Sequence, residues 1–145
     1  MEINIHRLSE EAVVPSNAYH GDAGFDLVSV ESVEISPKET RKVKTGIIIE
    51  IPEGYGGFIL PRSGMSVNNH ITIPNSPGLI DSGYRGEVLV ALHNNSEKRY
   101  EVNAGDRIAQ MVIMQVSQTN FNEVSIEKIS DTERSTGGFG SSGGS

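Results

Sequence analysis

The chain has 145 residues and a formal net charge of −7, with 12 Lys and Arg residues against 19 Asp and Glu residues. This length suits a single domain with its own core, and the acidic balance excludes a general nucleic-acid binder, because that affinity comes from clustered Lys and Arg. Cysteine is absent, which excludes disulfides and thiolate metal sites.

Short apolar segments rich in Val and Ile, separated by turn residues, predict an all-β protein. We expect the strand over residues 87–93 to enter a hairpin at Asn94-Asn95. One short helix is expected after Arg62-Ser-Gly64. The pattern favours a β-sandwich or barrel, with strands over residues 3–8, 25–30, 41–51, 57–60, 87–93, 100–102 and 108–116.

The composition changes near residue 130, where alternating apolar residues give way to Gly, Ser and Thr. We therefore divide the chain into a β-barrel domain, residues 1–130, and a flexible C-terminal arm, residues 131–145. No apolar run approaches the ~20 residues that span a bilayer, and MEINIHRLSE lacks the pattern of a secretion signal. We expect a cytoplasmic protein that binds no membrane.

Two stretches in the first half carry more Gly, Asp and Arg than strands require. Ala23-Gly-Phe-Asp-Leu27 places Asp26 between large apolar residues, where turn capping is the simpler interpretation. Pro61-Arg-Ser-Gly-Met-Ser66 would expose backbone N–H groups at a helix start beside the forked donor of Arg62, which suits phosphate oxygens. A plain helix start beside a surface Arg explains this stretch as well.

Two further stretches lie in the second half. NSPGLIDSGYRGE, residues 75–87, turns back on itself and sets Asp81 beside Ile80, where partial burial would raise its basicity toward that of a general base; a purely structural hairpin is the alternative. AGDRIAQ, residues 104–110, places Gln110 on the strand face of Ile108, within reach of an oxygen-rich ligand or of water. Asp106 and Arg107 can pair at the turn.

Together with RSTGGFGSSG near the C-terminus, these stretches resemble the five motifs of the trimeric dUTP diphosphatases (dUTPases), in family order and over nearly the whole chain. The resemblance implies a jelly-roll-type β-barrel and a homotrimer. It implies hydrolysis of dUTP to dUMP and pyrophosphate with Mg²⁺ as cofactor, which lowers dUTP and supplies dUMP for thymidylate synthesis. Each active site would take the first, second and fourth motifs from one subunit, the third from a neighbour and the fifth from the third subunit's arm.

The resemblance also implies residue roles. Asp81 would be the general base for the attacking water, and Asp26 would hold the metal through a bound water. Asn75 would bind the uracil edge and reject cytosine, while Tyr84 would pack under the deoxyribose and exclude UTP. The other implied substrate-binding residues are Arg62, Ser63, Gly64, Gly78, Ile80, Gln110, Arg134, Gly138, Phe139 and Gly140. Arg85 and Glu87 are expected to be structural.

The arm is expected to be disordered alone and to become ordered over bound nucleotide, with Arg134 on the γ-phosphate and Phe139 stacked over uracil. A plain solvated tail is the alternative. Two other functions share the scaffold: a dCTP deaminase, alone or bifunctional, and a non-catalytic trimeric binding protein. Ammonia release from dCTP would identify the first. Loss of Asp81, Arg62 or Phe139 would favour the second, and all three residues are present.

Overall fold

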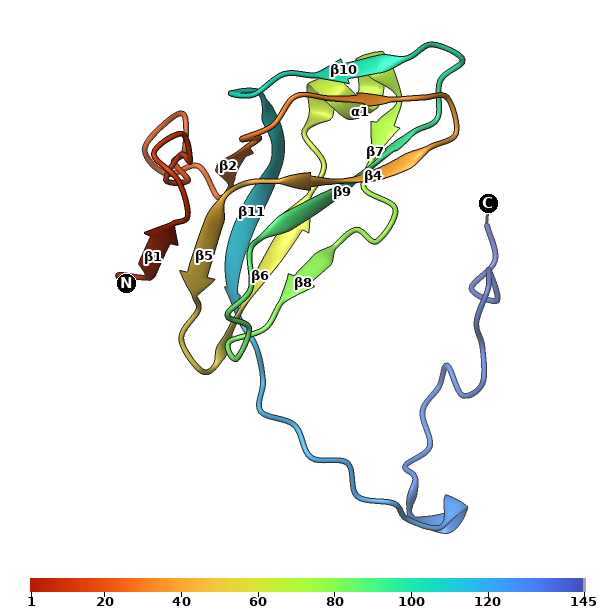
Figure 1. Ribbon diagram of the computed structural model, residues 1–145. Helices are drawn as coiled ribbons and strands as arrows, with labels where there is room; N and C mark the ends of the chain where they lie inside the picture. Colours follow the sequence, from red (N-terminus) through yellow and green to blue (C-terminus); the bar gives the residue numbers. More distant parts are fainter. Residues whose placement is uncertain (145) are drawn as a thin grey trace.

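Short antiparallel strands wrap around one core in the computed structural model, which describes residues 1–144 (Figure 1). The all-β prediction is confirmed, and the helix expected after Arg62 is α1. The elements are β1 (Asn4–Arg7), β2 (Phe25–Val28), β3 (Val33–Ile35), β4 (Thr40–Lys44), β5 (Ile47–Glu50), β6 (Tyr55–Leu60), α1 (Ser63–Asn69), β7 (Ile71–Thr72), β8 (Gly78–Ile80), β9 (Leu89–Asn94), β10 (Tyr100–Val102), β11 (Arg107–Gln115) and the 3-10 helix η1 (Ile126–Lys128).

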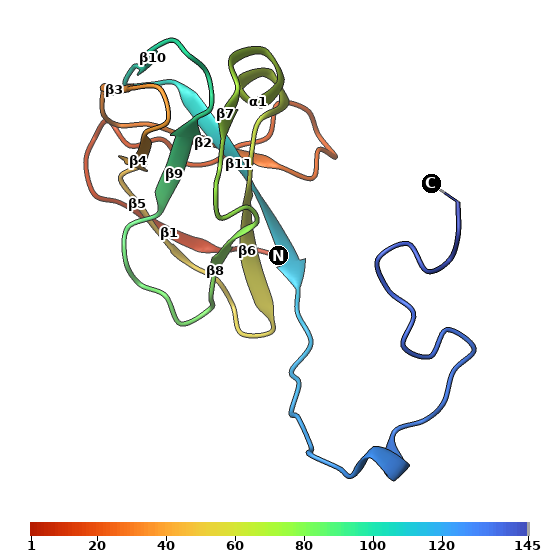
Figure 2. The ribbon, with the colours of Figure 1, turned by 90° about the vertical axis from the view of Figure 1, so that its right-hand side faces the viewer.

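The core lies between two larger sheets, ordered β2-β11-β6-β8 and β4-β9-β7, while the pairs β1-β5 and β10-β3 extend the wall. Figure 2 shows β6 and β11 on one side of the barrel and β4 and β9 on the other. Burying each Ile, Leu or Val contributes about 1.5–3 kcal/mol, and this burial fixes which strand face points inward. The fully buried apolar side chains include Leu27, Ile35, Val43, Ile47, Ile51, Ile71, Val88, Val90, Leu92, Val102 and Ile108.

The strand predicted over residues 41–51 is two strands, β4 and β5. Between them Gly46 has a φ of 69°, which L side chains rarely adopt. The buried Thr45 hydroxyl donates to the Val88 carbonyl at 2.5 Å and fixes the bend. As a result β4 pairs with β9, whereas β5 pairs with β1. The prediction missed β3, β7 and β8, which have only two or three residues each and carry no periodic pattern.

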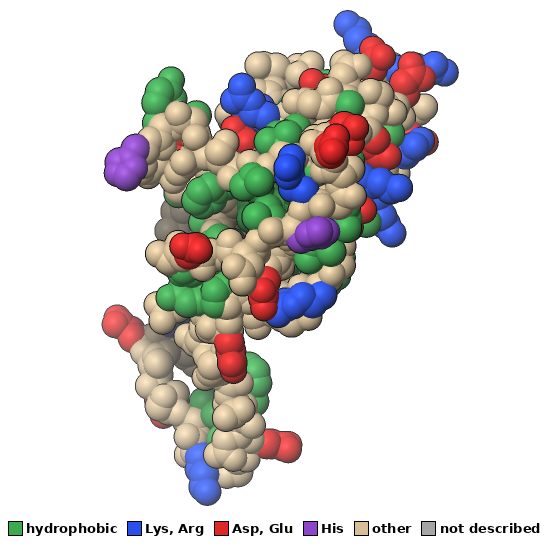
Figure 3. Space-filling model, turned by 60° about the vertical axis from the view of Figure 1, so that its left-hand side comes forward, with side chains coloured by type: hydrophobic (Ala, Val, Ile, Leu, Met, Phe, Trp, Pro, Cys, Tyr) green, Lys and Arg blue, Asp and Glu red, His purple; other side chains and the backbone are tan. Residues whose placement is uncertain are grey.

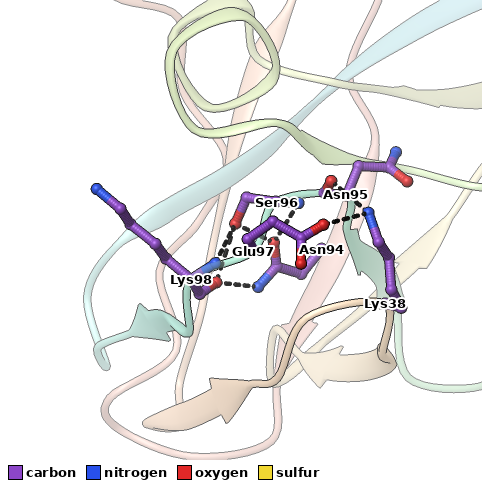
Figure 4. Close-up of polar contacts among 6 residues, drawn as sticks. All are labelled: Lys38, Asn94, Asn95, Ser96, Glu97 and Lys98. Atoms are coloured by element: carbon purple, nitrogen blue, oxygen red, sulfur yellow. Dashed lines mark hydrogen bonds and ion pairs between the residues drawn. The ribbon is translucent and has the colours of Figure 1, made fainter.

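The predicted hairpin after β9 is wrong, because β10 pairs with β3 and not with β9. The fully buried Asn94 organises the turn instead (Figure 4). Its Nδ2 donates to the carbonyls of Ile35 at 2.9 Å and Lys98 at 2.7 Å. Its Oδ1 accepts from the N–H and hydroxyl of Ser96, at 2.9 and 2.7 Å. These bonds direct the chain from one sheet to another.

The C-terminal segment leaves the barrel after β11. The Val116 N–H still donates to the Gly54 carbonyl at 2.8 Å, whereas nearly all of residues 117–144 are exposed. Figures 1 and 2 show this segment extended away from the barrel. The predicted boundary at residue 130 falls within it, and Ser145, the last residue of the predicted arm, lies outside the described residues.

Among residues 1–144, none of the helices has the length and apolar character needed to cross a membrane.

Candidate active site

Asp26, Arg62, Arg107 and Gln110 form one polar group on the outer side of three neighbouring chain segments, which we term the Asp26 cluster. β11 sets Gln110 opposite Asp26 of β2 on one side and opposite Leu60 of β6 on the other. Arg62 follows the end of β6, and its Nε donates to Asp26 Oδ1 at 3.1 Å. Gln110 Nε2 donates to the Pro61 carbonyl at 2.9 Å and holds the chain just before Arg62.

Arg107 brings a second guanidinium to the same carboxylate, with its Nη1 3.5 Å from Asp26 Oδ2. The turn-capping interpretation of Asp26 is therefore wrong, as is a pairing of Asp106 with Arg107: Asp106 Oδ2 accepts from the Asn103 N–H at 2.8 Å. A bulge in β11 between Arg107 and Ala109 interrupts the two-residue alternation. The reasoning that placed Gln110 on the face of Ile108 was wrong for this reason.

Gly24 leaves room for the Gln110 amide. A Cβ built on Gly24 would lie 2.5 Å from Gln110 Oε1, closer than real Cβ atoms come. The glycine of the first stretch and the glutamine of the fourth therefore fit together in space, although 86 positions separate them in the sequence. This contact gives the first stretch a steric role beside the ionic role of Asp26.

Ser63 and Gly64 begin α1 and are exposed. Arg62 occupies the N-cap position without a side-chain capping bond, and the Ser66 N–H donates to the Arg62 carbonyl at 3.1 Å. The N–H groups of the first helical turn have no intrahelical acceptors. They stand beside the Asp26 cluster as donors available to a ligand.

A second group lines a cavity of about 170 Å³ beside β8, which we term the β8 pocket. Five predicted site residues meet there: Asn75, Gly78, Ile80, Asp81 and Tyr84. β8 is held in place by pairing with β6, where Ile59 lies opposite Gly78. The remaining lining residues are Ile59, Leu79, Glu87, Val88 and Leu89.

The Tyr84 ring forms one wall of the β8 pocket and is 44% exposed. Its hydroxyl donates to the Glu87 carbonyl at 2.8 Å. A Cβ built on Gly86 would lie 2.5 Å from the Tyr84 hydroxyl oxygen, so only glycine allows the loop to close on the ring. The Glu87 carboxylate accepts from the Gly46 N–H at 3.0 Å and ties this loop to the β4–β5 bend.

Arg85 fixes the preceding turn. Its Nη1 donates to the carbonyls of Ser82 at 2.7 Å and Tyr84 at 2.9 Å, and its Nη2 lies 3.6 Å from Glu50 Oε1. The predicted structural roles of Arg85 and Glu87 are confirmed by these bonds.

Asp81 is exposed, so the prediction that its own loop would bury it is wrong. Neighbouring strand residues point to opposite faces, and Ile80, only 6% exposed, takes the inward position. The carboxylate therefore points outward from the end of β8. Within one chain, Asp81 lines the open β8 pocket.

The predicted arm residues stay apart from both groups. Phe139 is fully exposed, and Arg134 Nε donates to the nearby Gly137 carbonyl at 2.8 Å. Gly138 and Gly140 lie in the same exposed segment, away from the barrel (Figure 2). The Asp26 cluster and the β8 pocket are themselves on opposite sides of β6 in the sheet. One chain thus carries three separate groups of predicted site residues.

Similarity to known proteins identifies the family of this chain. The family model described as dUTPase matches residues 10–143. The chain belongs to the dUTPase family. It is 48% identical to the deoxyuridine 5′-triphosphate nucleotidohydrolase of Crocosphaera subtropica over 143 residues, covering 99% of both chains. It is 46% identical to the enzyme of the same name from Clostridium kluyveri, with 99% of both chains covered.

Solved dUTPase structures share the fold. The Staphylococcus bacteriophage 80alpha dUTPase, a G164S mutant solved with dUpNHpp, superimposes with a TM-score of 0.91 at 31% identity and 98% coverage of both chains. The dUTPase of phage phi11 of S. aureus, a D95N mutant described with a structural Mg(II) ion, gives a TM-score of 0.81 at 30% identity, covering 88% of this chain and 99% of the phage chain. The predicted family and the jelly-roll-type barrel are confirmed.

Sequence reasoning missed two residues near the dUTPase-family motifs. Arg107 was visible in the fourth motif as a charged residue, but its pairing with Asp26 depends on the pairing of β11 with β2, two strands far apart in the sequence. Tyr100 lines a cavity of about 500 Å³ together with Arg62, Asp106 and Arg107. Burial, and then the Asp106 carboxylate, raises the pKa of Tyr100 above its ordinary value of 10.0, against the effect of Arg62. A tyrosine at the start of a short strand gave no sequence signal for this position.

Proposed function

We propose that this chain hydrolyses dUTP to dUMP and pyrophosphate as a magnesium-dependent homotrimer. The observation that carries the proposal is the presence, on one family scaffold, of the Asp26 cluster beside exposed helix N–H groups and of the β8 pocket with its carboxylate and tyrosine ring. Similarity to deoxyuridine 5′-triphosphate nucleotidohydrolases over nearly the whole chain supports it. The reaction would lower dUTP in the cytoplasm and supply dUMP for thymidylate synthesis.

The Asp26 cluster would bind the triphosphate. Arg62 donates its Nε–H to Asp26, which leaves the two terminal amino groups of its guanidinium for phosphate oxygens. The N–H groups of Ser63 and Gly64 and the second N–H of the Gln110 amide add neutral donors on the same side. Such fixed donors stabilise the charge that moves onto the leaving pyrophosphate.

The donor set fits a magnesium ion carried on the nucleotide. Mg²⁺ at nucleotide sites takes one or two carboxylates, substrate phosphates and several waters. Asp26 supplies one such carboxylate, and within residues 1–144 no group of three or more His, Cys, Asp or Glu side chains could hold a metal unaided. Asp26 would contact the ion through a water. When bound, the ion neutralises phosphate charge and orients the triphosphate for in-line attack.

The β8 pocket would bind the nucleoside. The Asn75 side chain and the backbone of residues 75–81 would pair with the uracil edge, where the amino group of cytosine would meet donors. Asn75 Nδ2 would lie 3.3 Å from a Cβ built on Gly78, so a larger residue at this position would crowd the amide. Because its hydroxyl is bonded to Glu87, the Tyr84 ring is held in place, and its exposed face would pack under the deoxyribose and leave no room for a 2′-hydroxyl.

Asp81 would accept a proton from the water that attacks the α-phosphorus. General-base catalysis contributes roughly 10²- to 10⁴-fold when the base is positioned and its hydration is reduced. In one chain the carboxylate is exposed. The nucleotide and a neighbouring subunit would therefore supply the burial that its own loop does not.

In one chain the Asp26 cluster, the β8 pocket and the arm residues lie apart. We propose a homotrimer because it would bring these three groups together from different subunits. An apolar face on β6, β8 and β11 offers a contact surface: Phe58 lies opposite both Leu79 and Val112, and Leu79 and Met114 are 67% and 49% exposed. A second apolar surface is a depression of about 370 Å³ on the side that Figure 3 brings forward, lined by Met1, Ile3, Ile5, Val14, Pro15, Phe25, Ile49, Met111 and Ile113. A solution mass three times the 15.6 kDa of one chain would support the assembly.

Pyrophosphate release from dUTP, dCTP, dTTP and UTP, measured in parallel with Mg²⁺, tests the proposal. We expect turnover of dUTP alone. Comparable turnover of UTP would contradict the role of Tyr84, and ammonia release from dCTP would identify a deaminase. A protein that binds dUTP but releases no pyrophosphate would be a binding protein, and the proposal would fail.

A further inference from the structure

We infer that Arg107 is a positioning residue, which holds the Asp26 carboxylate in the one orientation that serves both Arg62 and the metal on the triphosphate. The inference rests on the proposed function. Arg107 acts through Asp26 and is assigned no contact with the nucleotide.

Two arginines contact the Asp26 carboxylate, one at each of its oxygens. Arg62 Nε is 3.1 Å from Oδ1 and Arg107 Nη1 is 3.5 Å from Oδ2, so each oxygen has its own cation. The Asp26 side chain is 20% exposed, whereas those of Arg62 and Arg107 are 34% and 57% exposed. The terminal torsion of an aspartate is soft and roughly two-fold. With Arg62 alone the carboxylate could rotate about that torsion, and Arg107 prevents this.

The pairing of β11 with β2 accounts for the reach of Arg107. Arg107 lies opposite Val28, two residues along β2 from Asp26, which makes the two side chains diagonal neighbours across the strands. The register shifts immediately after Arg107. This shift sets Gln110, in place of Ala109, opposite Asp26, so that Arg107 and Gln110 both lie beside it.

Stability alone does not explain the pair. An ion pair whose arginine is more than half exposed adds little to the stability of a fold. Its effect on orientation is larger, because Asp26 in turn directs Arg62: the bond from Nε to Oδ1 fixes the guanidinium, and its terminal amino groups remain as donors for phosphate oxygens. Loss of Arg107 would therefore weaken phosphate binding indirectly, first through Asp26 and then through Arg62.

Arg107→Gln tests this. Partners that orient a metal-binding carboxylate change metal affinity or activity by roughly 10- to 100-fold, and we expect kcat to fall by that factor. Affinity for a magnesium-loaded imido analogue of dUTP, measured by calorimetry, should weaken by about 10-fold or more. Affinity for dUMP, which lacks the β- and γ-phosphates, should stay unchanged because the β8 pocket is intact. Arg107→Lys keeps a cation near Oδ2 and should recover part of both losses.

The control is Arg99→Gln, which removes an arginine that is 72% exposed and lies 3.4 Å from Glu34. It should leave kcat and both affinities unchanged. Both Gln variants should keep the melting temperature within about 4 °C of the wild type. Wild-type kcat in Arg107→Gln, equal weakening of dUMP and analogue binding, or a Lys variant as impaired as the Gln variant would each overturn the inference. An inactive wild-type protein would instead refute the proposed function.

Discussion

Gly24→Ala is a small change whose effect follows directly from the geometry. The new Cβ would stand 2.5 Å from Gln110 Oε1, and the contact must open by at least 0.5 Å to reach the 3.0 Å that real Cβ atoms keep. Gly24 does not have a positive φ, so its backbone accepts alanine. The flexible end of Gln110 therefore moves, and the barrel does not.

Gly24→Ala should lower both the free energy of unfolding and the rate of dUTP hydrolysis. Rotating the amide breaks the Gln110 Nε2 bond to the Pro61 carbonyl, which costs about 0.5–1.5 kcal/mol of the free energy of unfolding. It also removes a donor from the proposed triphosphate site, where a hydrogen bond to a charged group contributes about 1.5–3 kcal/mol. We therefore expect kcat/KM for dUTP to fall about 10- to 150-fold, with a small loss of melting temperature.

A double-mutant cycle isolates the contact. The measurements are kcat/KM for magnesium-loaded dUTP and the melting temperature of Gly24→Ala, Gln110→Ala and the double variant. Once Gln110 is alanine there is no amide to displace, so adding Gly24→Ala should cost nothing more. Wild-type kcat/KM in the single Gly24 variant, or a full Gly24→Ala loss in the Gln110→Ala background, would refute the reasoning.

Four further predictions concern Asp81, the C-terminal arm, Asn94 and Tyr100. Asp81→Asn should lower kcat by roughly 10²- to 10⁴-fold while calorimetry still detects the imido analogue; retained turnover would exclude Asp81 as the base. Truncation before Arg134 should cost roughly 10²-fold or more in kcat without changing the melting temperature, and an unchanged rate would make the arm dispensable. Asn94→Ala removes the side-chain donor to the Ile35 carbonyl and one of the two donors to the Lys98 carbonyl, and should lower the free energy of unfolding by about 1–3 kcal/mol in urea titrations, whereas the exposed neighbour Asn95→Ala should have little effect. Since its pKa is raised, Tyr100 keeps its proton in the folded chain after the unfolded chain has lost it; stability should therefore fall as pH rises above about 10, and less steeply in Tyr100→Phe.

The motifs could be read from the sequence because each combines residue types that strands and turns do not need. The Asp, Tyr and Gly of residues 75–87 exceed what a turn requires, and the structure brings Asn75, Asp81 and Tyr84 to one cavity. Long strands such as β11 were predictable because apolar residues recur in them, whereas β7 and β8 are too short for a pattern.

The remaining features depend on contacts between distant segments. The partner of Asp26 could not be read from the sequence, because Arg107 and Asp26 meet only through the pairing of β11 with β2, two strands far apart in the chain. The hairpin after β9 was expected from turn residues, but the buried bonds of Asn94 override that local preference. The exposure of Asp81 was missed because β8 is too short to be recognised as a strand, and only the inward position of Ile80 in that strand shows that the next residue turns outward.

The central claim is that one active site draws Asp81 and the arm from different copies of the chain. Complementation tests it: Asp81→Asn and the truncation before Arg134, each expected to keep no more than about 1% of wild-type activity alone, are unfolded together, refolded as an equal mixture and assayed for dUTP hydrolysis. In random trimers with sites shared among three chains, each mixed trimer holds one intact site, which predicts about a quarter of wild-type activity. No activity in the refolded mixture, with mixed trimers verified by mass, would contradict the account.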